Sequence, residues 1–232
     1  AEGYLRGLAV HRPESPDPDA REFLIGLHAQ PDSPWNTLAW TTELPERLPP
    51  PQARDVVVDV DHQDALEAAL VEHPRARIRL APGTYFGPLS VDGQVLERSE
   101  HAPLGTVIIE ADGTCLSTRG ACLRGLIIRG GDAPAVVAEG GFLRIEECHF
   151  EGGTVGLAAK TATIVQLDGV VFEGLSDTAV VLADGLCRAR NVTISEVGAG
   201  FTLEGARLSL EDALVESADR AGIIAHGGRS CS

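Results

Sequence analysis

The sequence has no methionine, a single lysine (Lys160) and few aromatic residues, which form 4% of its 232 positions. A chain of this length would ordinarily contain about five methionines, so we expect a processed piece or fragment of a longer protein. No stretch approaches the roughly 20 consecutive apolar residues of a membrane-spanning helix. The sequence therefore predicts a chain without a membrane span.

Basic side chains are also scarce, because 34 acidic residues outnumber 19 basic ones and give a formal net charge of −15. Binding to a phosphate backbone needs a concentrated positive patch, so nucleic acid is not an expected partner. The five cysteines are odd in number and form no Cys-x-x-Cys pair. This pattern argues against a disulfide framework and a zinc site. It gives only weak support to a cytoplasmic location, and the compartment stays open.

Prolines divide the chain, since most of them lie before residue 52. We place a boundary near residue 55, between a Pro-rich segment (1–55) and a second region (56–232). The first segment is expected to be extended or to form short strands that pack on the second. Residues 63–72 follow the potential N-cap Asp61 and predict an amphipathic helix with Leu66 and Ala69 on its apolar face.

A repeat of about 22 residues begins near Leu123. Two of its columns share this spacing and alternate as in a strand: Ile128, Phe150, Phe172, Ile194 and Val215, and two residues earlier Leu126, Cys148, Val170, Val192 and Ala213. Two further alternating strands follow in each period. Helical repeats are longer, at about 33 residues, and have 3.6-residue apolar spacing. The pattern predicts an all-β parallel solenoid.

The helix at 63–72, the segment Ala76 to Tyr85 and the following coils resemble the right-handed parallel β-helix superfamily of pectate-lyase-like proteins. The resemblance covers roughly residues 56–232. It implies a right-handed, single-stranded β-helix with a short N-terminal capping helix. It also implies carbohydrate-binding or sugar-hydrolase relatives, including bacterial ones, but this fold hosts lyases, hydrolases and inert scaffolds alike.

The catalytic patterns of that superfamily do not recur here. Glu151 and Glu173 lie one coil apart and could share a cation, but Ser195 interrupts the series. Asp168, Asp177 and Asp184 occupy different coil positions instead of the three-Asp cluster that the hydrolases use. We therefore predict no catalytic residue, no metal site and no cofactor.

Candidate binding residues lie on the outward positions of the strands. A polar stripe could hold a sugar or a carboxylate, or could be an ordinary salt-bridged exterior; it contains Arg144, Gln166, Arg188 and Ser209. Two apolar stripes are expected to be covered by residues 1–55, by a partner protein or by a second copy of the chain. They contain Val136, Ala158, Val180, Thr202 and Ile224 on one strand, and Ile127, His149, Val171, Thr193 and Leu214 on another.

The last coil ends at His226 without a capping helix, so its backbone needs further chain, the tail or a second copy to cover it. A homodimer could therefore form through an apolar stripe or through this coil. The function we expect is a non-catalytic module that binds a protein or saccharide, with Arg144, Gln166, Arg188, Val136, Val180, Val171 and Leu214 as contact residues. The alternative is a polysaccharide lyase or glycoside hydrolase acting through Arg144, Arg188 and nearby acids.

Overall fold

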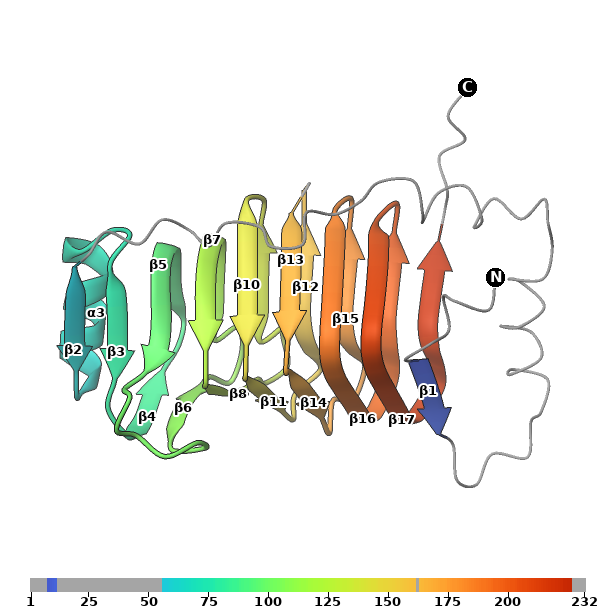
Figure 1. Ribbon diagram of the computed structural model, residues 1–232, viewed down its shortest axis with the longest axis horizontal. Helices are drawn as coiled ribbons and strands as arrows, with labels where there is room; N and C mark the ends of the chain where they lie inside the picture. Colours follow the sequence, from blue (N-terminus) through green and yellow to red (C-terminus); the bar gives the residue numbers. More distant parts are fainter. Residues whose placement is uncertain (1–7, 12–55, 162, 227–232) are drawn as a thin grey trace.

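The computed structural model describes residues 8–11, 56–161 and 163–226, and its strands form one parallel solenoid of about eight coils (Figure 1). In chain order the elements are β1 (Leu8–His11), β2 (Val57–Val60), α3 (Gln63–Glu72), β3 (Arg77–Leu80), β4 (Gly83–Phe86), β5 (Leu89–Arg98), β6 (Val107–Glu110), β7 (Leu116–Arg124), β8 (Ile127–Arg129), β9 (Val136–Glu139), β10 (Phe142–Glu146), β11 (His149–Glu151), β12 (Val155–Lys160), β13 (Ile164–Asp168), β14 (Val171–Glu173), β15 (Thr178–Ala183), β16 (Leu186–Glu204) and β17 (Arg207–His226). The predicted parallel β-solenoid is confirmed.

From β3 onward, each coil contributes strands to three faces of the solenoid, which we call faces A, B and C. Face A contains β2, β3, β10 and β13 and the stretches of β5, β7, β16 and β17 that pair with them. Face B contains β4, β6, β8, β11 and β14 and the next stretches of β16 and β17. Face C contains β9, β12 and β15 and the remaining stretches of the long strands.

Like residues stack on like residues inside the coil, as the repeat predicts. Phe150 pairs with Phe172 and Phe172 with Ile194, and all three side chains are fully buried. The two phenyl rings are stacked, with centroids 4.6 Å apart and planes inclined by 19°. The aliphatic and aromatic columns of successive coils thus form one continuous core.

Helix α3 covers the first coil at the N-terminal end of the stack (Figure 1). Its bounds are those predicted, and Leu66 and Ala69 are buried against the coil. The N-cap is His62 instead of the predicted Asp61, and it makes no side-chain capping bond. Two glutamines hold the helix in place: the Gln63 side chain donates to and accepts from the Phe86 backbone, and Gln94 donates to the Leu70 carbonyl.

The expected outward placement of Val136 and Val180 is wrong, because both side chains are fully buried in the core. Leu157 pairs with both of them, at separations of 21 and 23 residues, so the turns before face C absorb a one-residue change in each direction. A prediction that assumes a constant period of 22 residues therefore misaligns these strands by one residue. A shift of one residue moves each side chain to the opposite side of its strand. The outward row of face C is Val137, Ala158, Val181, Thr202 and Ile224.

The other end of the stack carries β1, which pairs in parallel with residues Ala213–Glu216 of β17 (Figure 1). The first strand of the chain therefore lies beside the last coil, at the opposite end from β2. The rest of the Pro-rich segment, including both tryptophans, lies outside the described residues, as does the tail 227–232. The expected packing of that segment on the solenoid stays a prediction.

Candidate binding faces

The predicted polar stripe is a continuous row on the outside of face A. Arg144 pairs with Gln166, Gln166 with Arg188, and Arg188 with Ser209. The row extends towards the N-terminal end through Cys122 and Val95, which are buried although they occupy outward positions. The structure thus brings together the four polar residues that the sequence selects.

A row of charges runs beside this stripe, two residues further along each strand. It contains Asp59, Arg79, Glu97, Arg124, Glu146, Asp168, Arg190 and Glu211, and neighbours in this order are paired in the sheet. Because strand residues i and i+2 share a side of the sheet, a repeated polar residue at this position builds a ladder along the whole rod. We call this row the charge ladder.

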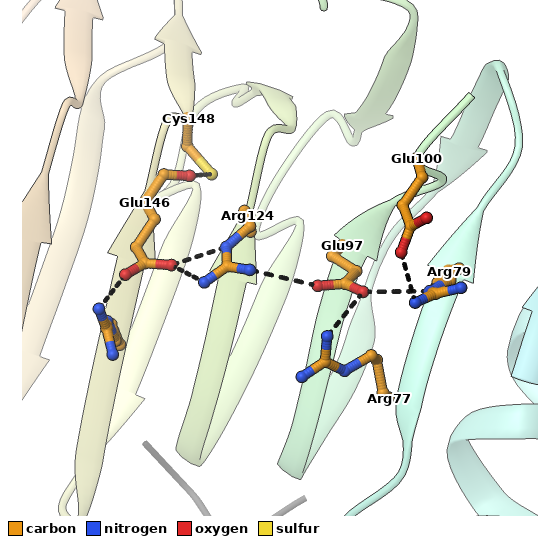
Figure 2. Close-up of polar contacts among 8 residues, drawn as sticks. Arg77, Arg79, Glu97, Glu100, Arg124, Glu146 and Cys148 are labelled. Carbon is orange, nitrogen blue, oxygen red and sulfur yellow. Dashed lines mark hydrogen bonds and ion pairs between the residues drawn. The ribbon is translucent and has the colours of Figure 1, made fainter. Parts of the chain in front are cut away.

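Two carboxylates of the charge ladder are nearly enclosed by arginines (Figure 2). The Glu97 side chain is only 7% exposed and lies 3.5 Å from Arg77, 3.3 Å from Arg79 and 3.7 Å from Arg124. Glu146 forms ion pairs with Arg124 on one side and Arg144 on the other. A carboxylate this far from water requires such partners. The ladder thus joins successive coils through charge-assisted hydrogen bonds.

Asp168 occupies the same ladder position one coil after Glu146. Arg190 donates to it through Nη2 at 2.6 Å and Nε at 3.3 Å, and Asn191 donates through its side-chain amide at 3.2 Å. The hydrogen bond from Arg190, followed by that from Asn191, holds the pKa of Asp168 below its ordinary value.

We expect this pairing to make stability depend on acid. The folded-state pKa of Asp168 lies below the unfolded value, which is about 3.9. Its contribution is therefore complete above the unfolded pKa and is lost as pH falls through the folded pKa. Thermal unfolding should show Asp168→Asn less stable than wild type near neutral pH, with the gap closing below about pH 4. In an Arg190→Gln background the gap at neutral pH should be smaller; an unchanged gap would contradict the pairing.

The polar stripe also holds a buried donor and a buried acceptor that have no hydrogen-bond partner among the described residues. These atoms are Arg144 Nε and Gln166 Oε1, which belong to paired residues on adjacent coils. The remaining guanidinium contacts are already made, since Arg144 pairs with Glu146 and Arg188 lies 3.5 Å from Glu211. This position suits a group that both accepts and donates hydrogen bonds, such as a hydroxyl or an amide.

Face B carries the predicted apolar row. Its members pair across successive coils and are all partly exposed: Ile108, Ile127, His149, Val171, Thr193 and Leu214. Val171 and Leu214 lie on this surface, as expected. We call this set the face B row.

Carboxylates flank the face B row two residues further along the strands. Glu110, Glu151, Glu173 and Glu216 occupy this position in four of the coils, and Arg129 lies 2.9 Å from Glu151. His149 lies 3.4 Å from Glu151 and 3.1 Å from Glu173, whereas the sequence analysis above names it only as a member of an apolar stripe. The missed signal is that Glu151 follows His149 by two residues, on the same side of the strand, and that Glu173 occupies the same position on the next coil.

The other residues considered for chemistry are dispersed. Asp168 binds Arg190, Asp177 forms an ion pair with Arg220, and Asp184 lies in a turn with φ of 57°. Within residues 8–11, 56–161 and 163–226, no group of three His, Cys, Asp or Glu side chains is arranged to hold a metal ion. Burial raises the pKa of Cys115 and Cys122 to about 11 and that of Cys148 to about 12, so these thiols stay protonated at neutral pH.

A polar depression of about 380 Å³ lies at the N-terminal end, beside the first steps of the charge ladder. Asp59, Asp61 and Glu100 line it together with Arg79 and His101. Arg79 is held there by Glu97 and Glu100, the latter at 2.7 Å. This depression could not be predicted from the repeat, because several of its lining residues lie in irregular loops that precede the regular coils.

Together these features define a parallel β-solenoid with a charged, internally paired face A and an apolar row on face B. No known family model matches the chain, and no curated protein matches it either. The described part of the chain contains no helix with the length and apolarity needed to cross a membrane.

Proposed function

We propose that this protein is a non-catalytic binding module that docks a protein partner along face B. In this proposal the solenoid is right-handed and of the pectate-lyase-like type, and it serves as a rigid rod. The observation that carries the proposal is the face B row, in which four aliphatic side chains stay partly exposed with His149 and Thr193 between them. At about 4.8 Å per coil, the five steps from Ile108 to Leu214 extend over about 24 Å, which suits a protein surface.

The chemistry of the row favours a protein over a saccharide. Sugar rings stack on aromatic side chains, and the row contains aliphatic residues, a threonine and a histidine instead. Carboxylates of Glu151, Glu173 and Glu216 border it, and the chain carries a formal net charge of −15. A partner with an apolar ridge bordered by Lys or Arg is complementary to this arrangement.

A saccharide is the second candidate ligand. Two buried atoms on face A that have no hydrogen-bond partner among the described residues favour it. Arg144 Nε and Gln166 Oε1 are a buried donor and a buried acceptor on adjacent coils, and a sugar hydroxyl could satisfy them once the covering side chains shift. A catalytic role is less well supported, because Arg144 and Arg188 already pair with carboxylates. Such pairing keeps a guanidinium charged and disfavours its use as a base.

Substitution on face B tests the protein-docking proposal. A partner is first recovered from cells with the wild-type chain, identified, and purified for a direct titration. Val171→Glu should weaken that binding by roughly tenfold or more, since it places a charge in the centre of a desolvated contact. The matched control is Val181→Glu, a partly exposed outward valine on face C, which should bind as wild type.

Equal binding by wild type and Val171→Glu, with both chains folded, would place the contact elsewhere. A glycan panel and a uronate polymer assay with and without Ca²⁺ address the other functions. Glycan binding that is lost in Gln166→Ala but kept in Val171→Glu would favour the saccharide. Turnover of the uronate polymer that is lost in Arg188→Ala would contradict the proposed binding module and favour a lyase.

A further inference from the structure

The last coil is only partly covered in the described structure. β1 pairs with Ala213–Glu216, a short part of β17, which runs from Arg207 to His226. On face A, Leu208 and Leu210 occupy inward positions but are partly exposed, whereas their partners one coil earlier, Cys187 and Ala189, are fully buried. A partly exposed apolar edge of this kind favours the addition of a further strand.

The register of β1 shows which residues precede it along that edge. Leu8 pairs with Ala213, so stepping back one residue at a time sets Gly7 against Asp212 and Arg6 against Glu211. The same register sets Leu5 against Leu210 and Tyr4 against Ser209. Residues 1–7 lie outside the described residues, so their placement follows here from the pairing of β1 and from residue type.

Each of these residues fits the column that it would join. Asp212 and the residues at the same position in the two preceding coils have positive φ values, 51° for Asn191 and 65° for Gly169. Glycine adopts such values without strain, so Gly7 suits this position. Arg6 would follow Glu211 in the charge ladder, where opposite charges are favoured between neighbours. Leu5 would follow Leu210 in the aliphatic column of face A.

The sequence contains the same pattern inside the solenoid. Residues 5–8 read Leu-Arg-Gly-Leu, as do residues 123–126 at the end of β7 and the start of face B. In the structure Leu8 belongs to the column that contains Leu126, through the successive pairings of face B. Residues 5–8 thus share their sequence with a part of the solenoid in which the same column is occupied.

We infer that the face A edge of β17 at residues 209–212 is a docking surface for residues 4–7 of the same chain, which extend β1 along the C-terminal end of the solenoid. Reach permits this, because about eight coil steps of about 4.8 Å separate the two ends, and residues 12–55 can span over 100 Å at about 3.3 Å per residue. The connection also gives the segment a high effective concentration at its own edge, which favours it over a second copy. This inference is independent of the proposed partner on face B.

A disulfide between paired outward positions tests the inference in the full chain. Tyr4→Cys and Ser209→Cys are combined in a Cys231→Ser background, leaving the four buried cysteines unchanged. Paired residues on neighbouring strands lie about 4.8 Å apart, within the range of about 4.4–6.8 Å between Cα atoms that a disulfide needs. The control combines Tyr4→Cys with Gln166→Cys, two coils further from the edge, at about 14 Å.

Mild oxidation with oxidised glutathione removes one hydrogen from each thiol, and intact mass and non-reducing electrophoresis report the product. We expect an internally cross-linked monomer for the Tyr4–Ser209 combination, at least about tenfold faster than for the control. A cross-linked dimer would assign the edge to a second copy and overturn the inference. Equal rates for the two combinations, or no cross-link, would also overturn it.

Discussion

Phe172→Ala is expected to lower the free energy of unfolding by about 3–5 kcal/mol, as large aromatic truncations in cores do. Phe172 is fully buried and its ring stacks on that of Phe150 at a centroid distance of 4.6 Å. The stacked coils above and below are fixed by backbone hydrogen bonds, so they cannot collapse into the space that the ring leaves. Urea denaturation followed by circular dichroism measures this loss.

Two control substitutions separate the loss of core packing from the general effect of a substitution in this strand. Phe172→Leu keeps most of the volume and should cost clearly less than Phe172→Ala. Val171→Ala, on the outward side of the same strand, removes a partly exposed side chain and should cost about 1 kcal/mol or less. If Phe172→Ala were no more costly than Val171→Ala, the inward column would not be the core.

Gly141→Ala is expected to destabilise the protein by about 2–5 kcal/mol, through backbone strain of about 1–2 kcal/mol and overpacking of about 1–3 kcal/mol. Gly141 has φ of 73°, and an added Cβ would lie 1.9 Å from the Arg119 carbonyl oxygen of the previous coil. Neither backbone can yield without breaking the pairing of β7 with β10. Thermal and urea unfolding measure the effect.

Gly152 supplies the control for Gly141. It also has positive φ, 65°, but an added Cβ would meet nothing within 4 Å. Gly152→Ala should therefore show the conformational cost alone, about 1–2 kcal/mol. Equal losses for the two variants would contradict the close approach of neighbouring coils at Gly141.

The regular half of the solenoid is predictable from the sequence because its columns repeat in chemistry as well as in spacing. Phe150 and Phe172 lie over one another, and Arg144, Gln166 and Arg188 form one row, as their 22-residue separations require. On face C the same rule fails at Val136 and Val180, where turns of different length compensate one another. Since Val136, Val137, Val180 and Val181 are all valines, hydrophobicity alone cannot choose between the two registers.

The N-terminal half of the charge ladder cannot be predicted from a fixed period for a related reason. Arg79, Glu97 and Arg124 are separated by 18 and then 27 residues, so no fixed period connects them. Their coils differ in loop length, and only the strand pairing aligns them. The pairing of β1 with β17 cannot be predicted from the repeat either, because it joins residues about 200 positions apart in the sequence.

Faces A and B differ in how their outward side chains are paired. On face A the charge ladder satisfies its own arginines and carboxylates, so these residues chiefly hold successive coils together. On face B the aliphatic side chains lie partly exposed beside carboxylates, so this apolar surface is not fully buried within the coil. We therefore expect replacement of Val171 to change the stability of the protein little and its affinity for the partner strongly.

Distances between spin labels on the face B row test the central claim, that each coil stacks in register on the one before it. Labels are attached at Ile108→Cys with Thr193→Cys, and at Ile108→Cys with Leu214→Cys, with Cys231→Ser; the buried native cysteines resist labelling. The account predicts backbone separations of about 19 Å and 24 Å, with one added coil giving about 5 Å. Equal, reversed or widely scattered distances for the two pairs would contradict the solenoid.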